Sequence, residues 1–79
     1  MDYILEKGAA YIADVKLTWL QNVATNEDVA DKFRELGFTE VVVTGSGRNR
    51  QVSGMWNGQT QKIQVPDSVR NVVKLQNKT

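Results

Sequence analysis

The chain of 79 residues contains no cysteine and no histidine, and it has a single proline. Without these side chains it has no thiol nucleophile, no disulfide, no catalytic triad with histidine, and no zinc finger or iron–sulfur site. It also has no apolar run near the roughly 18 residues of a membrane span, and no secretory signal at its N-terminus. We therefore expect no metal, no cofactor, no membrane contact and a cytoplasmic location.

What is present is typical of one globular domain covering residues 1–79. Hydrophobic residues make up 41% and charged residues 24%, close to globular averages. A domain this small buries only about 60% of the surface that its unfolded chain exposes. Because it has no disulfide, either its hydrophobic core alone stabilises the fold or a second copy of the chain contributes. The net charge is +1, but residues 1–40 are acidic and residues 41–79 are basic. The basic half hints at an anionic partner.

The main helix is predicted at about 26–36. Thr25 is a good N-cap, and Asp28 three residues later completes a capping box. Gly37 is a natural residue to end the helix, and Phe38 can then fold back on Phe33. The apolar residues that recur at helical spacing and should face the core are Val29, Ala30, Phe33 and Leu36.

Two strands are predicted before this helix and one directly after it. Alternating apolar and polar residues predict a strand over about 11–20, with Ala13, Val15, Leu17 and Trp19 facing inward. Residues 2–10 are ambiguous between a strand and a brief helix, and we favour a strand, with a turn at Lys7-Gly8. β-Branched residues predict a further strand over about 40–45, followed by a glycine-rich loop.

A hairpin is predicted from two strands over about 50–56 and 59–65. The Asn57-Gly58 pair between them is typical of a type I′ turn. With Trp56 opposite Gln59, this turn places Val52 against Ile63 and Arg50 against Val65 on the side of Trp56. The other side of the hairpin would be polar and would carry Gln51, Ser53, Met55, Thr60, Lys62 and Gln64.

The C-terminal segment is predicted as a short helix over about 68–76, although Val73 and Leu75 also fit a strand. The expected fold class is therefore α+β, with the main helix packed on a mostly antiparallel sheet. The order helix, three strands, helix over about 25–76 is similar to that of the double-stranded-RNA-binding domain. That family opens its last helix with a basic Lys-Lys-x-Ala-Lys run, whereas residues 66–70 are Pro-Asp-Ser-Val-Arg. The resemblance implies an element order, and it carries over no site residue.

The glycine-rich loop after residue 44 is a candidate for either a dinucleotide-binding loop or an anion-binding loop. The run Gly45-Ser46-Gly47 does not extend to a dinucleotide motif, because Arg50 stands where the third glycine would be and a strand follows. Arg48 and Arg50 could instead border a nest of backbone N–H groups that binds an anion, although a solvated loop is the simpler interpretation. Trp56 is either a core residue, which we favour, or a stacking platform.

These patterns predict a non-catalytic binding or assembly module, because the acidic side chains of the helix form no desolvated carboxylate pair. A chain of this size is also typical of an accessory or inhibitory protein of a bacterium or phage. The partner would be another protein or a second copy, met by the polar sheet face, the basic loop or an open strand edge. The alternative is nucleic-acid binding through Arg48, Arg50 and Lys62. The candidate contact residues are Ser46, Arg48, Arg50, Gln51, Ser53, Met55, Thr60, Lys62 and Gln64.

Overall fold

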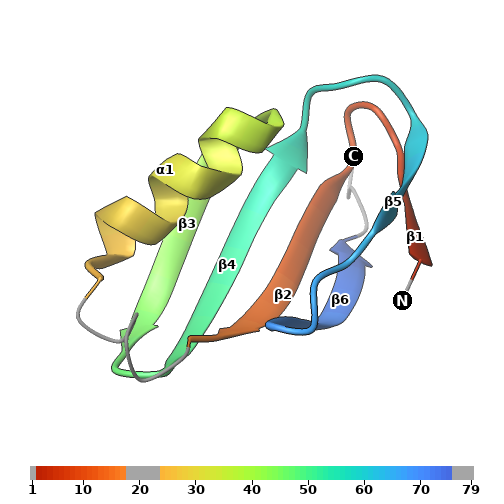
Figure 1. The fold of residues 1–79 in the computed structure, drawn as a ribbon. Helices are drawn as coiled ribbons and strands as arrows, with labels where there is room; N and C mark the ends of the chain where they lie inside the picture. The colour runs from red at the N-terminus through yellow and green to blue at the C-terminus, as the bar shows by residue number, and fades with distance from the viewer. Residues whose placement is uncertain (1, 18–23, 76–79) are drawn as a thin grey trace.

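A computed structural model describes residues 2–17 and 24–75, which form one helix and six strands (Figure 1). Four strands make an antiparallel sheet in the order β3-β4-β2-β6, and β1 pairs with β5 in a separate antiparallel sheet. The α+β class is thus confirmed. The elements are β1 (Asp2–Leu5), β2 (Ala10–Lys16), α1 (Asn26–Leu36), β3 (Phe38–Ser46), β4 (Asn49–Trp56), β5 (Gln61–Gln64) and β6 (Val69–Leu75).

The core lies on one face of the four-stranded sheet and has two parts. Under α1, which runs beside β3 in Figure 1, Ala30 packs with Val41, Val52 and the inward residues of β2. At the other end, Leu5 of β1 and Ile63 of β5 pack with residues of β2, β4 and β6, among them Trp56. The helix and the small sheet therefore cover the same face of the large sheet.

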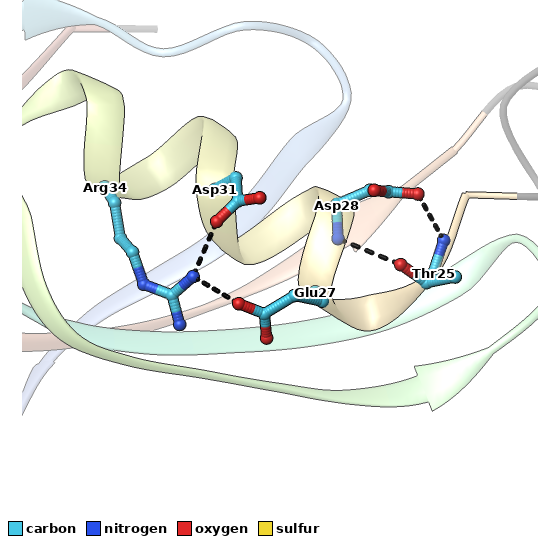
Figure 2. A network of polar contacts seen from close by, with 5 residues as sticks. All are labelled: Thr25, Glu27, Asp28, Asp31 and Arg34. Carbon is cyan, nitrogen blue, oxygen red and sulfur yellow. Dashed lines mark hydrogen bonds and ion pairs between the residues drawn. The ribbon is translucent and has the colours of Figure 1, made fainter.

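The helix begins and ends where the sequence predicts. The Thr25 hydroxyl accepts a hydrogen bond from the Asp28 N–H at 3.0 Å, and Asp28 Oδ2 accepts one from the Thr25 N–H at 3.0 Å (Figure 2). Gly37 ends the helix at φ 119°. The rings of Phe33 and Phe38 meet edge to face, as expected. Leu36, however, is 64% exposed, which corrects its predicted place in the core: only the earlier part of the apolar face is covered.

The predicted first strand is confirmed as β2. Ala13 and Val15 are buried, and Leu17 packs against the same cluster. The remainder of that prediction, including Trp19, lies outside the described residues. The favoured strand within residues 2–10 is confirmed as β1, and a turn follows at residues 7–8. β1 pairs with β5, however, and makes no hairpin with β2.

The hairpin predicted at Asn57-Gly58 is wrong. β4 pairs with β2 and β3, so Val52 lies opposite Ala13 and Val43 and does not face Ile63. Neither Asn57 nor Gly58 has the positive φ that both central residues of a type I′ turn require. The strand predicted over 59–65 is present as the shorter β5, but it belongs to the other sheet.

Contacts of Trp56 hold the end of β4 in the sheet and position the loop that follows it. The Trp56 N–H donates to the Ala9 carbonyl at 2.9 Å, and its carbonyl accepts from the Gly8 N–H at 2.8 Å. Its indole Nε1–H donates to the Gln59 carbonyl at 2.8 Å, so the following loop folds over the ring. Gly58 is needed for this close approach, because a Cβ there would lie 2.5 Å from the indole Cζ2. Trp56 is 4% exposed, a core residue as favoured.

The helix predicted over 68–76 is also wrong. Residues Val69–Leu75 form β6, which pairs antiparallel with β2, and residue 76 lies outside the described residues. The valine-rich segment fits the strand alternative, because β2 has a free edge that β5 does not occupy. With a strand in place of the last helix, the element order of the double-stranded-RNA-binding domain is not found.

Both edge strands of the four-stranded sheet carry a β-bulge. In β3 the register shifts between Thr39 and Val42, where Glu40 has φ 51°. In β6 the register against β2 shifts around Asn71, which has φ 56°. A bulge interrupts the row of free backbone groups along an edge, so both edges are poor templates for a further strand.

Replacement of Gly58 by alanine tests the packing of the loop on Trp56. We expect Gly58→Ala to lower the free energy of unfolding by about 1–3 kcal/mol, because the new methyl group meets the indole ring. The measurement is urea denaturation, and Gln59→Ala, at an exposed neighbour, is the control. Equal stability of Gly58→Ala and wild type would contradict the packing described.

The Asp28 carboxyl of the capping box should make the stability of the fold depend on pH. Hydrogen bonds from the backbone N–H and the side chain of Thr25 hold the pKa of the Asp28 carboxyl below its usual range. A lowered pKa contributes stability above the unfolded pKa of about 3.9, and this contribution is lost as the pH falls through the folded pKa. We therefore expect wild type to melt higher than Asp28→Asn at about pH 6 and the difference to close near pH 2. A difference in melting temperature that is constant over this range would contradict the capping role.

Candidate binding surface

The side chains that alternate with the core residues point to the opposite face of the four-stranded sheet, here called the open face. No element of residues 2–17 and 24–75 packs on this face. Strand register arranges its side chains in rows that cross the sheet. The rows are Thr39-Met55-Ala10-Leu75, Val42-Ser53-Ile12-Val73, Thr44-Gln51-Asp14-Arg70 and Ser46-Asn49-Lys16.

The first two rows form the apolar half of the open face. Val42 is 56% exposed, Val73 is 53% exposed and Leu75 is 39% exposed. Ile12 and Met55 lie between these edge residues and are half-buried by their neighbours. Apart from Thr39 and Ser53 these two rows are apolar, and together they form an apolar strip across all four strands. Exposed apolar surface of this kind marks interaction sites.

The last two rows form the polar half of the open face. Asp14 lies opposite Arg70 of β6 and Gln51 of β4, and Asn71 Nδ2 donates to its Oδ2 at 2.8 Å. Lys16 lies at the same end of the sheet. This half therefore carries both signs of charge close together and has little net charge.

The structure brings together only part of the predicted contact set. Gln51, Ser53 and Met55 share the open face, as expected for one side of β4, and Ser46 lies in its last row. Arg48 is exposed in the β3–β4 turn beside this end of the sheet. These five residues lie on or next to one surface.

The other three polar residues of the predicted face lie elsewhere. Lys62 and Gln64 are on β5, in the second sheet, and Thr60 lies just before it. Lys62 Nζ is 3.5 Å from Asp2 Oδ2, and the Thr60 hydroxyl accepts from the Lys7 N–H at 3.1 Å. The predicted face that joins β4 to β5 does not form, because β4 and β5 do not pair.

Arg50 has a structural environment that the sequence did not reveal. It is 6% exposed and lies on the core face. Its Nε–H donates to the Gly47 carbonyl at 3.1 Å, Nη2 to the Ala24 carbonyl at 2.8 Å, and Nη1 to Asn26 Oδ1 at 2.8 Å. Asn26 in turn donates to the Gly45 carbonyl at 3.1 Å. Arg50 thus ties the β3–β4 turn to the start of α1.

Sequence reasoning missed a groove on the core face. The groove has a volume of about 590 Å³ and lies between α1, with Phe33 and Leu36, and the segment from Ile63 to Val72. Val15 and Val52 of the sheet are among its lining residues. The groove arises because the helix and the small sheet cover different parts of one face of the large sheet. Predicting it would have required the strand order, which the sequence did not reveal.

The titratable groups with shifted pKa values take part in surface contacts. Hydrogen bonds to Glu27 and then Asp31 raise the pKa of Arg34 on the outer side of α1 (Figure 2). A hydrogen bond to Glu6 at 2.6 Å raises the pKa of Lys74 and links β6 to the segment after β1. Across residues 2–17 and 24–75, no three acidic side chains are grouped as a metal site requires.

Comparison of the chain with protein-family models, with curated proteins and with solved structures finds no match. The helix α1 has neither the length nor the apolar character of a membrane-crossing helix, and the described residues include no other. The function of this chain is therefore inferred from its own surfaces.

The two arginines of the predicted loop should behave differently on substitution. Arg50→Met removes buried hydrogen bonds, so we expect the free energy of unfolding to fall by about 1.5–3 kcal/mol. Arg48→Ala changes an exposed turn residue and should stay within about 0.5 kcal/mol of wild type. Chemical denaturation measures both, and equal stability of the two variants would contradict the role given to Arg50.

Proposed function

We propose that this chain is a non-catalytic protein-binding module whose contact surface is the open face of the four-stranded sheet. The observation that carries the proposal is the apolar strip, in which Val42 and Val73 are each more than half exposed. Exposure of such a strip to water is unfavourable, and a protein surface that covers it regains that free energy. The accessory or inhibitory role and the cytoplasmic location remain predictions from the sequence.

Contact through the face is favoured over strand addition at an edge of the four-stranded sheet. A partner strand needs a regular row of free N–H and C=O groups. The outer strands β3 and β6 are both interrupted by bulges, at Glu40 and Asn71. Side chains of the open face are therefore the better recognition elements.

A protein partner is favoured over nucleic acid for reasons of charge. Non-specific nucleic-acid binding depends on several cations that neutralise phosphates together. Of the three proposed cations, Arg50 is buried under its own hydrogen bonds, Lys62 is close to Asp2 in the other sheet, and Arg48 is exposed in the β3–β4 turn. The open face itself carries Asp14 between Lys16 and Arg70. Nucleic-acid binding is kept as an outcome of the test below.

The absence of cysteine from the sequence allows a direct test. Ser53→Cys, labelled with a photoactivatable maleimide, places a cross-linker in the middle of the apolar strip. Gln64→Cys, labelled in the same way, is the matched control on exposed β5. Each folded, labelled protein is irradiated in an extract of the source cells, and the adducts are sized before and after nuclease treatment.

The proposal predicts nuclease-resistant protein adducts with Ser53→Cys that are absent, or several-fold weaker, with Gln64→Cys. Adducts that disappear on nuclease treatment would replace the proposal by the nucleic-acid alternative. Equal adduct patterns from the two positions, or no adduct from Ser53→Cys, would refute the open face as the contact surface.

A further inference from the structure

We propose that the partner of the open face is a second copy of this chain, packed face to face in a two-fold symmetric dimer. This inference rests on the proposed function and names its partner. Two features of the open face support a second copy, its self-matching apolar strip and its mixed charges, and the size of the face limits how strong the dimer can be.

The apolar strip can match itself. Two sheets that pack face to face lie about 10 Å apart and interdigitate the side chains of their inner faces. Here the strip extends from Val42 on one edge strand to Val73 on the other. A two-fold axis in the plane of the interface can therefore lay the strip of one copy across that of the other, as an isologous contact requires.

The charges of the polar half fit the same arrangement. Asp14, Lys16 and Arg70 place one negative and two positive groups at one end of the open face. A carboxylate of one copy thus has cations available on the other, and the apolar strip contains no charge that would be buried. A face of strong single sign would instead select a partner of opposite charge.

The size of the open face sets the strength of the dimer. Four strands at about 4.8 Å spacing, and seven residues at about 3.3 Å, give a face of roughly 19 Å by 23 Å. Two copies would together bury roughly 900 Å² if each face is treated as flat. This area is below the 1,200 Å² or so at which stable interfaces begin. We therefore expect a weak, concentration-dependent dimer and not an obligate one.

The test is sedimentation equilibrium of the purified, unlabelled full chain from low micromolar to several hundred micromolar concentration. We expect the mass of wild type to rise from one chain towards two. Val73→Asp and Val42→Asp, at opposite ends of the strip, should each weaken the dimer at least tenfold. Leu36→Asp is the matched control, because Leu36 is more exposed than either valine but lies on α1. Circular dichroism shows whether each variant is folded. Because there are two strip variants, the test can still be made if one of them does not fold.

The outcomes separate this inference from the proposed function. A wild type that stays monomeric at every concentration overturns the second copy, while nuclease-resistant adducts of Ser53→Cys with a larger protein would leave the proposed function standing. A dimer that Leu36→Asp weakens as much as the folded strip variants overturns the inference, because the contact then involves another surface. A dimer lost only with the strip variants supports it.

Discussion

The architecture depends on how the chain leaves β4 at Trp56. The backbone of Trp56 hydrogen-bonds to residues 8 and 9, its ring is buried, and its indole N–H holds the next loop through Gln59. Because this loop folds over the ring, β5 cannot return along β4 as a hairpin. It pairs with β1 instead, and the edge of β2 is left for β6. The local packing at Trp56 thus agrees with a strand order in which both edges of β4 are occupied, by β3 and β2.

This strand order creates the two surfaces of the molecule. The small sheet joins α1 on the core face, where the two leave a groove of about 590 Å³ between them. The other face of the four-stranded sheet has no cover from the described residues, and β6 adds Val73 and Leu75 to its apolar half. Bulges at Glu40 and Asn71 make both edges irregular. The proposal that partners bind the open face is based on this combination of an exposed apolar strip and interrupted edges.

The accuracy of the sequence predictions follows the range of the interactions concerned. The bounds of α1 depend on local caps at Thr25 and Gly37, and they were predicted correctly. The pairing of β5 depends on contacts with β1, far away in the chain, and Asn57-Gly58 favoured a local turn that does not form. The sequence places Arg50 on the side of Trp56 but predicts an anion-binding or solvated residue, because its acceptors Ala24 and Asn26 come close only in the folded chain. Gln51, Ser53 and Met55 were placed together correctly, since they alternate along one strand.

The proposal that two copies of this chain meet through their open faces is best tested by methyl NMR with a soluble paramagnetic probe. At low protein concentration, the probe should broaden the methyl signals of Val42 and Val73 as strongly as those of Ile4 and Leu36, which are comparably exposed. At high concentration, the account predicts that the two valines become protected while Ile4 and Leu36 stay broadened. Equal broadening of all four residues at every concentration would contradict self-association through the open face.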